Sequence, residues 1–485
     1  MATTKKSTTK TTAKRKILFV ASEAAPFIAT GGLAEVIGSL SKALAKSRKY
    51  DVRVIIPLYE DIKDEYRKKF KFVKSITVPL SWRQQYCGIF EYKQGGVTFY
   101  FVDNEYYFKR HGCYGYFDDG ERFAFFCASV MEILPHIDFF PDVLHCHDWQ
   151  SALAALYLKT NYRRAEYQNI KALFTIHNIE YQGWYSMGVL EELFGISYEF
   201  KNLVEFNGGI NLMKGAIECS DKFSTVSPSY ANEIKDPYFA HGLHEIVRRN
   251  EYKLCGILNG IDPDYYNPST DKALIANYSA EDMSNKAVCK AELQRLLNLP
   301  AKPDTPIVAM ITRLVAHKGL DLVTAVIEDL LQRDVQFVLL GTGEGYYEGF
   351  FRELARRHPD KVAACITFNS DLSRKIYAGA DLFLMPSKSE PCGLSQMIAS
   401  RYGAVAVTRE TGGLRDSILA YGAGGNGFTF ANYNAHDMLY VLNEAIDLYY
   451  DKERWSQLVH KAATTDFTWR ASAKRYDALY AELLK

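Results

Sequence analysis

The residue with the clearest chemical potential is an acid in a turn between a predicted strand and a predicted helix. Glu390 follows the apolar run Leu382–Met385, and Gly393 lies where a helix could begin. In an open parallel sheet, loops after strand ends and helix N-termini converge with unpaired N–H groups, and ligands bind there. The sequence therefore predicts an anionic ligand beside the Glu390 carboxylate, although an ordinary helix entry would show the same local pattern.

Two cationic side chains and a histidine also lie at the ends of predicted strands. Arg313 and Lys318 follow the apolar run 307–312, and His177 closes the run 172–176. Arginine offers a planar fork for phosphate oxygens, whereas lysine offers a compact charge. Simple solvation is the alternative for the two cations, and a structural role is the alternative for the histidine.

Glycine loops provide a further pattern that suits phosphate. The pairs at 31–32 and 412–413 each precede a helix-like segment, and Gly341 ends a predicted strand. Without a Cβ, glycine lets the backbone approach phosphate oxygens closely, and a helix N-terminus adds partial positive charge. Each loop alone is weak evidence, because most such glycines form ordinary turns.

Three segments carry side chains that could bind a metal, but we expect none of them to do so. The aspartates of the segment 262–264 flank a proline, which favours a turn. Along a strand, His145 and His147 would point to one face and Cys146 to the other. The segment 241–245 lacks the order His-Glu-x-x-His and is interpreted as a helix entry. The sequence therefore predicts no metal and no cofactor.

Composition narrows the class of protein. The chain has 485 residues, which allows roughly two to four domains. A net charge of +1 gives no reason to expect nucleic acid or a membrane as a partner. Nine cysteines without a Cys-x-x-Cys pair argue against a disulfide framework. No apolar run has the length of a membrane span and no signal core follows the start, so we expect a cytoplasmic protein.

Apolar runs that suit strands alternate with helical patterns, and this series starts twice. Repeated strand-to-helix order predicts a parallel sheet covered on both faces, here in two Rossmann-like domains at 16–260 and 261–465. Residues 1–15 are mostly Thr, Lys, Ser and Ala and are expected to form a disordered basic tail, with a targeting peptide as the alternative. The strand candidates are 17–22, 143–146, 172–176, 307–312, 337–340, 365–368, 382–385 and 405–407, and the helix candidates include 34–47 and 151–159.

Four segments together resemble the bacterial-type glycogen and starch synthases, which are retaining glucosyltransferases of the GT-B class in glycosyltransferase family 5. The segments are 30–36, 175–179, 313–321 and 387–396. The resemblance implies an α/β fold with two Rossmann-like parallel-sheet domains facing across a cleft. It also implies that a last helix, at 466–485, crosses back onto the first domain.

The resemblance further implies an activity. The family transfers glucose from ADP-glucose to the non-reducing end of α-1,4-glucan, such as glycogen or maltooligosaccharides, with retention of configuration. ADP is preferred over UDP here because the similar chains are bacterial-type synthases. Another donor such as UDP-glucose, another acceptor, or a catalytically silent glucan-binding homologue remain the alternatives.

The family's functional positions can be carried over onto matching residues of this chain. Glu390 is expected to stabilise the positively charged sugar, Arg313 and Lys318 to contact the donor diphosphate, and His177 to meet the donor sugar. The remaining donor-binding candidates are Gly31, Gly32, Glu35, Asn259, Gly341, Phe368, Cys392, Gly393, Leu394, Thr411, Gly412 and Gly413, and the acceptor-binding candidates are Tyr114 and Asp148.

The chain departs from the family pattern at four positions. Ala29 stands where the family has a lysine that touches the donor, so one cation of the expected clamp is missing. Glu35 replaces an aspartate and keeps its charge, while Phe368 keeps the adenine-stacking ring without a hydroxyl. Ile398 lies where some relatives carry a second glutamate. Reduced donor affinity, a different nucleotide preference or a silent homologue would follow from the loss of the lysine.

Overall fold

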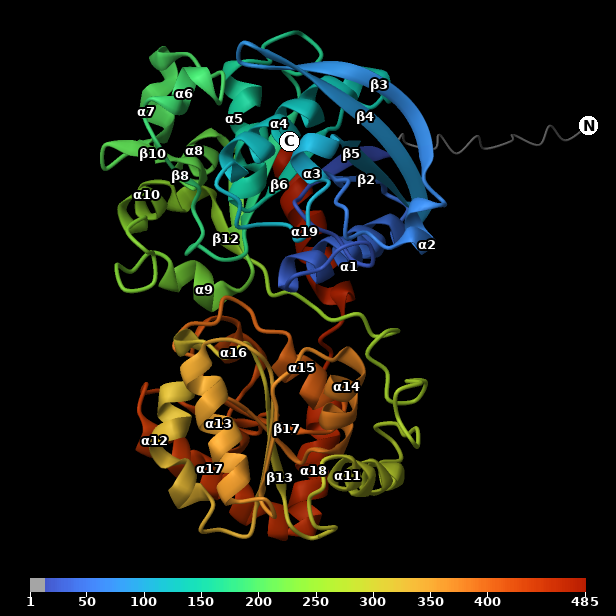
Figure 1. Ribbon diagram of the computed structural model, residues 1–485, viewed down its shortest axis with the longest axis vertical. Helices are drawn as coiled ribbons and strands as arrows, with labels where there is room; N and C mark the ends of the chain where they lie inside the picture. The colour runs from blue at the N-terminus through green and yellow to red at the C-terminus, as the bar shows by residue number, and fades with distance from the viewer. Residues whose placement is uncertain (1–13) are drawn as a thin grey trace, which may run out of the picture. The chain divides into compact units, whose positions relative to one another are not determined.

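The structure is a computed structural model that describes residues 14–485 (Figure 1). The chain forms two compact units. The N-terminal unit extends to Ile176 and adds Tyr181–Phe223 and Tyr476–Lys485, and the C-terminal unit comprises His177–Glu180 and Ser224–Arg475. Residues 1–13 of the predicted tail lie outside the described part, and Arg15 is already the first residue of a strand. The domain boundary near residue 260 stays a prediction.

The N-terminal unit is built on a mixed sheet, in which strands β7-β6-β1-β2-β5-β4-β3 follow one another. β1 pairs in parallel with β2 and β6, and its apolar run is buried on both sides, as expected for a parallel strand covered by helices. The bounds are β1 Arg15–Val20, β2 Tyr50–Pro57, β3 Lys71–Leu80, β4 Arg83–Gln94, β5 Val97–Asp103, β6 Val143–His147 and β7 Lys171–Ile176.

The antiparallel edge of this sheet departs from the all-parallel sheet that the sequence predicts. β3 pairs antiparallel with β4, and β4 pairs antiparallel with β5. The β3–β4 turn consists of Ser81 and Trp82, and Ser81 has a φ of 54°, which suits a two-residue hairpin. This turn lacks the glycine that usually marks a two-residue hairpin in a sequence.

Helices and a small second sheet complete the N-terminal unit. Helix α1 begins close to the predicted start and buries Leu33, Ile37 and Leu40, whose spacing places them on one face. The helices are α1 Gly32–Lys46, α2 Asp64–Arg67, α3 Glu105–Phe108, α4 Asp119–Ile133, α5 Trp149–Thr160, α6 Val189–Glu192, α7 Lys201–Val204 and α8 Leu212–Cys219. The small sheet comprises β8 Trp184–Ser186, β9 Glu205–Phe206 and β10 Gly209–Asn211, and β11 spans Lys222–Thr225.

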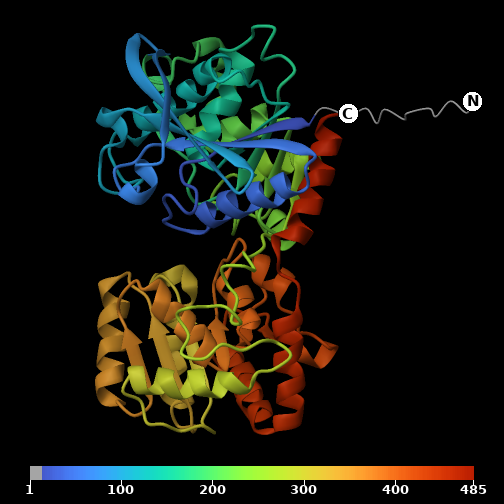
Figure 2. The same cartoon turned by 90° about the vertical axis from the view of Figure 1, so that its right-hand side faces the viewer.

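The C-terminal unit contains a parallel sheet of the order β15-β14-β13-β16-β17-β18. Helices α12, α13 and α17 lie on one side of it and α11 and α14 on the other (Figures 1 and 2). The strands of this sheet are β13 Ile307–Ile311, β14 Gln336–Leu340, β15 Val362–Cys365, β16 Leu382–Met385, β17 Val405–Arg409 and β18 Phe428–Phe430, and β12 Leu254–Gly256 is not part of it. The longer helices are α11 Ser284–Leu296, α12 Leu320–Leu330, α13 Gly345–Arg357, α14 Ser370–Gly379, α17 Ala435–Tyr450 and α18 Lys452–Thr464. The shorter helices are α9 Pro228–Glu233, α10 His244–Arg249, α15 Ser395–Arg401 and α16 Gly412–Ser417.

One strand of this sheet lies three residues earlier than predicted. The sequence predicts a strand at 365–368, whereas β15 ends at Cys365. The Asn369 side chain accepts the Leu372 N–H and caps α14, so the chain must already turn before that residue. Phe368 consequently lies in the turn with its ring 90% exposed.

The last helix, α19 Trp469–Leu483, contributes residues to both units. In the C-terminal unit, the Ser472 hydroxyl donates to the Leu258 carbonyl at 2.5 Å. In the N-terminal unit, the Tyr480 hydroxyl lies 2.9 Å from His145 Nδ1, and both side chains are fully buried. No helix among residues 14–485 combines the length and the hydropathy that a membrane crossing requires.

Candidate active site

The order of strands in the C-terminal unit reverses between β13 and β16. From β13 the chain adds β14 and β15 on one side and then returns to place β16 and β17 on the other. Ligands of open parallel sheets bind at such a switch point, outside the carboxyl ends of the strands. The loop after β13 carries Arg313 and Lys318, and the loop after β16 carries Glu390. The topology therefore brings the three predicted catalytic residues of this unit to one place.

These two loops pack directly against each other. The Lys388 N–H donates to the His317 carbonyl at 2.9 Å. Gly319 has a φ of 74°, and a Cβ at this position would lie 2.1 Å from the Pro386 carbonyl oxygen. Only glycine suits both the left-handed backbone and this close approach.

Glu390 is 7% exposed, and one of its carboxylate oxygens accepts two hydrogen bonds. Its Oε2 accepts from Lys318 Nζ at 2.6 Å and from the Ser387 hydroxyl at 3.0 Å. Hydrogen bonds with an ionised partner are stronger than neutral ones, so this arrangement holds the side chain of Glu390 firmly in place. Within residues 14–485, no side chain or N–H group donates to Oε1.

The cations beside this acid differ in their partners. Lys318 is half-buried and paired, whereas Arg313 is exposed and forms no ion pair with any residue from 14 to 485. Burial and the neighbouring Lys318 ammonium lower the pKa of His317, so this imidazole stays neutral at neutral pH. The loop after β13 thus presents one unpaired guanidinium.

The loop Thr411–Gly413 packs against the backbone of the acid. The Gly413 N–H donates to the Glu390 carbonyl at 3.1 Å, and the Gly412 N–H donates to Glu233 Oε1 at 2.8 Å. A Cβ at Gly412 would lie 2.0 Å from the Glu390 carbonyl oxygen. Both N–H groups are therefore engaged by the chain itself, and the glycines permit the contact with the acid's loop.

The segment 392–394 follows the acid and leads into α15. Burial raises the pKa of the Cys392 thiol to about 12, although hydrogen bonds with Asn259 act in the opposite direction. A thiol with so high a pKa is not a nucleophile at neutral pH. Asn259 is itself buried, and no partner within the described part of the chain reaches its Oδ1. Gly393 has a φ of 70°, which the turn into Leu394 and α15 requires.

His177 follows β7 and groups with the C-terminal unit. Burial lowers the pKa of this imidazole from 6.5 to about 3, so it is neutral at neutral pH. A neutral imidazole can donate one hydrogen bond and accept another, but it supplies no positive charge. The Ile179 N–H, two residues further along, donates to the Tyr230 hydroxyl at 3.1 Å and fixes the end of the turn.

The acid dependence of stability tests this half-buried histidine. Because the pKa of folded His177 lies below its ordinary value, the unfolded chain binds the extra proton, and stability falls as pH drops from 6.5 towards about 3. The stability that the neutral His177 contributes is fully present above pH 6.5. We expect His177→Gln to flatten the pH dependence by roughly 1 kcal/mol or more across the window, measured from urea midpoints. The same substitution at the exposed His436 should leave the slope unchanged, and equal slopes in both variants would contradict the assignment.

Five predicted residues lie in the N-terminal unit. Gly31 caps α1 without a side-chain hydrogen bond, and a Cβ at Gly31 or Gly32 would meet no atom within 4 Å. The chain's own packing therefore does not require glycine at these two positions. The other three are Glu35 in the first turn of α1, Asp148 at the start of α5, and Tyr114, whose hydroxyl lies 2.7 Å from that of Ser22.

A buried glutamate holds the residue before these glycines. Glu23 accepts from the Thr30 N–H at 2.5 Å and from the Thr30 hydroxyl at 3.2 Å. Burial raises the pKa of Glu23, and the bonds from Thr30 act in the opposite direction. Ala29, which precedes this contact, is exposed and brings no cation to the loop.

Gly341 and Phe368 are the two predicted donor-binding residues that follow β14 and β15. A Cβ at Gly341 would lie 1.8 Å from the Thr312 carbonyl oxygen, so packing between the ends of β13 and β14 already explains this glycine. Phe368 is exposed and makes its ring available to a ligand.

Substitution of Gly341 tests that packing. We expect Gly341→Ala to lower the free energy of unfolding by about 1–3 kcal/mol, because the backbone at Thr312 must move. Gly349→Ala is the matched control, since a Cβ there meets nothing within 4 Å and the residue lies inside α13. This control should raise stability by about 0.5–1 kcal/mol. Urea midpoints measure both, and a neutral Gly341→Ala would contradict the steric argument.

The segments that resemble metal sites have other partners. His145 Nε2 lies 2.7 Å from the Thr175 hydroxyl, and its Nδ1 is bound to Tyr480. Asp262 Oδ1 accepts the N–H groups of Asp264 and Tyr265, which is the turn that the proline predicts. Over residues 14–485, no group of three or more His, Cys, Asp or Glu side chains could hold a metal ion.

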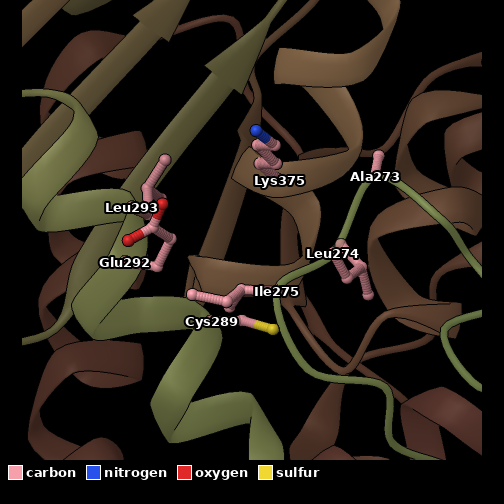
Figure 3. A pocket seen from close by; sticks show the side chains of 7 residues that line it. All are labelled: Ala273, Leu274, Ile275, Cys289, Glu292, Leu293 and Lys375. Atoms are coloured by element: carbon pink, nitrogen blue, oxygen red, sulfur yellow. The ribbon is translucent and has the colours of Figure 1, made fainter.

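A pocket of about 110 Å³ in the C-terminal unit lies away from the acid (Figure 3). Its walls come from the segment before α11, from α11 itself and from α14. The lining residues are Ala273, Leu274, Ile275, Cys289, Glu292, Leu293 and Lys375, and none of them is a predicted site residue.

Sequence reasoning missed two residues that contact the site. Ser387 lies three positions before Glu390 in the same turn, and this spacing could have indicated it. Glu233 lies 179 positions before the Gly412 that it binds, so no local pattern could have linked them.

Comparisons with known proteins agree with this geometry. The family model for the starch synthase catalytic domain matches residues 16–249, and the model for glycosyl transferases group 1 matches residues 298–461. The glycogen synthase of Desulforamulus reducens is 49% identical over 475 residues, which covers 97% of this chain and 99% of the relative. The glycogen synthase of Geobacillus thermodenitrificans is 47% identical, with 97% and 98% covered.

Solved structures extend the comparison. The catalytic domain of starch synthase IV from Arabidopsis thaliana, bound to ADP and acarbose, matches with a TM-score of 0.91 and 33% identity and covers 97% of this chain and 100% of that one. Sucrose-phosphate synthase from Thermosynechococcus elongatus matches with a TM-score of 0.62 and 16% identity, covering 97% and 99%. The second match supports the GT-B fold alone.

Proposed function

Because the chain belongs to the glycogen and starch synthase family of glycosyltransferases, we propose that it transfers glucose from ADP-glucose to an α-1,4-glucan with retention of configuration. The bond between sugar C1 and the β-phosphate breaks, and the acceptor 4-hydroxyl bonds to C1. Its proton passes to a phosphate oxygen or to solvent. ADP is favoured over UDP because a starch synthase of the same fold and 33% identity was solved with ADP.

The observation that carries this proposal is the convergence of an acid and two cations at the switch point of the C-terminal sheet. Cleavage leaves negative charge on the departing β-phosphate and positive charge on the sugar. Arg313 and Lys318 would stabilise the negative charge on the phosphate, and the Glu390 carboxylate would stabilise the positive charge on the sugar. Preorganised groups of this kind are commonly the largest single contribution to catalysis.

The diphosphate clamp is assigned to protein side chains. Arg313 has no ion pair within the described chain, so its planar fork is available for two phosphate oxygens. Lys318 is bound to Glu390 and would lie between the acid and the phosphate.

Sugar and base recognition use the unsatisfied groups beside the acid. The free Oε1 of Glu390 and the unpartnered Oδ1 of Asn259 can each accept a sugar hydroxyl. His177, neutral at neutral pH, can serve as a hydrogen-bonding partner of the donor sugar. The exposed Phe368 ring can stack on adenine.

The remaining positions follow the family pattern. Cys392, Gly393 and Leu394 continue the acid's loop towards the sugar and phosphate, and Glu35 lies in the first turn of α1. On the acceptor side, the family pattern places Tyr114 and Asp148 in contact with the glucan. The exposed Ala29 removes one cation from the clamp, which implies weaker donor binding than in relatives with lysine there.

Release of nucleoside diphosphate tests the proposal. ADP-glucose and UDP-glucose are each supplied with and without glycogen, in the presence of EDTA. Glycogen-dependent release of ADP that resists EDTA is the expected result, and proton NMR of the product should show α linkages. Release of UDP from UDP-glucose, without release of ADP from ADP-glucose, would show that the donor is UDP-glucose.

A silent glucan-binding homologue is the second candidate, and Ala29 is the observation that favours it. No release from either donor, combined with retention of the protein on immobilised glycogen, would establish that alternative. Restoring the cation by Ala29→Lys should then be tried. Tighter donor binding in this variant would show that the loop still accepts a diphosphate.

A further inference from the structure

The short helix α9 contacts the turn Thr411–Gly413, which in turn contacts the backbone of Glu390. Glu233, its last residue, accepts two hydrogen bonds on Oε1: from the Gly412 N–H at 2.8 Å and from the Thr411 hydroxyl at 2.9 Å. Thr411 lies in the turn between β17 and α16, Gly412 is the first residue of α16, and all these residues lie in the C-terminal unit. One carboxylate oxygen thereby fixes two successive residues of the turn.

The same turn determines where the backbone of the acid lies. The Gly413 N–H donates to the carbonyl oxygens of Glu390 at 3.1 Å and Pro391 at 3.2 Å. Gly412 approaches the Glu390 carbonyl so closely that a Cβ would lie 2.0 Å from it. A displacement of the turn must therefore displace Glu390, because the contact has no slack.

A second bond from α9 holds the other side of the acid's loop. The hydroxyl of Ser227, which caps α9, donates to the Pro391 carbonyl at 2.7 Å. Further along, Asp416 in α16 accepts the N–H and the hydroxyl of Ser229, both at 2.7 Å. Only the contact with Asp416 bypasses the acid's loop, so it serves as an internal comparison.

Stability alone does not account for Glu233. Burial raises the pKa of this carboxyl, while the Gly412 N–H, Thr411 and the nearby Arg409 act in the opposite direction. Its Oε2 is buried and has no hydrogen-bond partner among residues 14–485. An unsatisfied buried oxygen destabilises a fold, and such local conflicts concentrate at functional sites.

We propose that Glu233 is a positioning residue, whose Oε1 fixes the turn Thr411–Gly413 and through it the Glu390 carboxylate beside Lys318. The inference rests on the proposed glucosyl transfer. Glu233 itself does not touch the donor. Its role depends on the reach of an acceptor oxygen and not on its negative charge.

Two substitutions separate reach from charge. Glu233→Gln keeps the length and the acceptor oxygen but loses the charge, whereas Glu233→Asp keeps the charge and withdraws the oxygen by one methylene. We expect Glu233→Asp to lower kcat by roughly tenfold to a hundredfold, because small misplacements of catalytic groups have effects of that size. The KM for ADP-glucose should change less than kcat, and Glu233→Gln should retain most of the activity.

Asp416→Asn is the matched control, since it weakens the contact between α9 and α16 without touching the acid's loop. It should lower the melting temperature and leave kcat unchanged. An equal loss of kcat in Asp416→Asn would show a general loosening and overturn the proposal. Activity in Glu233→Asp with inactivity in Glu233→Gln would assign the role to charge and overturn it as well.

A readout that does not need turnover separates this inference from the proposed function. Hydrogen–deuterium exchange of a peptide that contains Gly412 and Gly413 should be faster in Glu233→Asp than in the unchanged chain, and close to normal in Glu233→Gln. Unchanged exchange in Glu233→Asp would overturn the positioning role even in a protein without activity. Failure of ADP release with the expected exchange pattern would instead reject the proposed donor reaction alone.

Discussion

Replacing Glu390 with alanine is expected to abolish glucose transfer while leaving ADP binding within about tenfold of the unchanged chain. The carboxylate faces the sugar carbon in the proposed reaction, whereas the diphosphate is held by Arg313 and Lys318. Loss of Glu390 therefore removes stabilisation of the developing positive charge without removing the cations. Turnover measured by ADP release and ADP affinity measured by calorimetry give the two quantities.

Glu390→Gln is the control for this prediction, because alanine leaves the ammonium of Lys318 without its partner. Glutamine keeps the side-chain volume and can still accept from Lys318 and Ser387. It should be nearly as inactive as alanine, with a smaller change in melting temperature. Full activity of either variant would reject the assignment of Glu390.

Replacing Lys318 with alanine is expected to lower turnover by about 10²–10³, the usual loss for one preorganised donor. The ammonium lies 2.6 Å from Glu390 Oε2, so its removal also takes away a contact that fixes the position of the carboxylate. Turnover measured by ADP release from ADP-glucose gives the size of the loss.

Arg313→Ala separates the two roles of these cations. Arg313 forms no ion pair with the acid, so its loss should reduce turnover and weaken ADP binding without disturbing the Glu390 side chain. Lys318→Arg should recover part of the lost turnover, because it restores a cation near Glu390. Unchanged turnover in Lys318→Ala would show that the pair is not needed for the reaction.

The sequence was sufficient to predict the location of the acid and its cations. Glu390, Arg313 and Lys318 each follow a short buried strand, and the carboxyl ends of parallel strands converge wherever the strand order reverses. The apolar run Leu382–Met385 coincides with β16, and the two-domain α/β class is confirmed. Prediction worked here because the signals are local.

Features that depend on contacts between distant segments could not be predicted. The bond of Glu233 to Gly412 joins residues 179 positions apart, and neither neighbourhood reveals it. The antiparallel pair β3–β4 also escaped prediction, since the Ser81–Trp82 turn carries no glycine. Gly412 is another case of a contact between distant segments. The sequence suggests that its loop could bind phosphate, whereas its N–H donates to Glu233, which only the fold brings there.

The folding of the N-terminal unit depends on helix α19, which is synthesised after all the other helices and strands. Tyr480 inserts a fully buried ring beside His145, across 335 positions of sequence. During synthesis, the ribosome releases the strands around His145 long before this tyrosine exists, so the core of the N-terminal unit stays unfilled beside His145 until Tyr480 is made. Contacts of such long range slow folding and leave apolar surface open to aggregation. A chain cut just before Tyr480 should therefore be recovered mainly as insoluble protein, although every proposed catalytic residue is present.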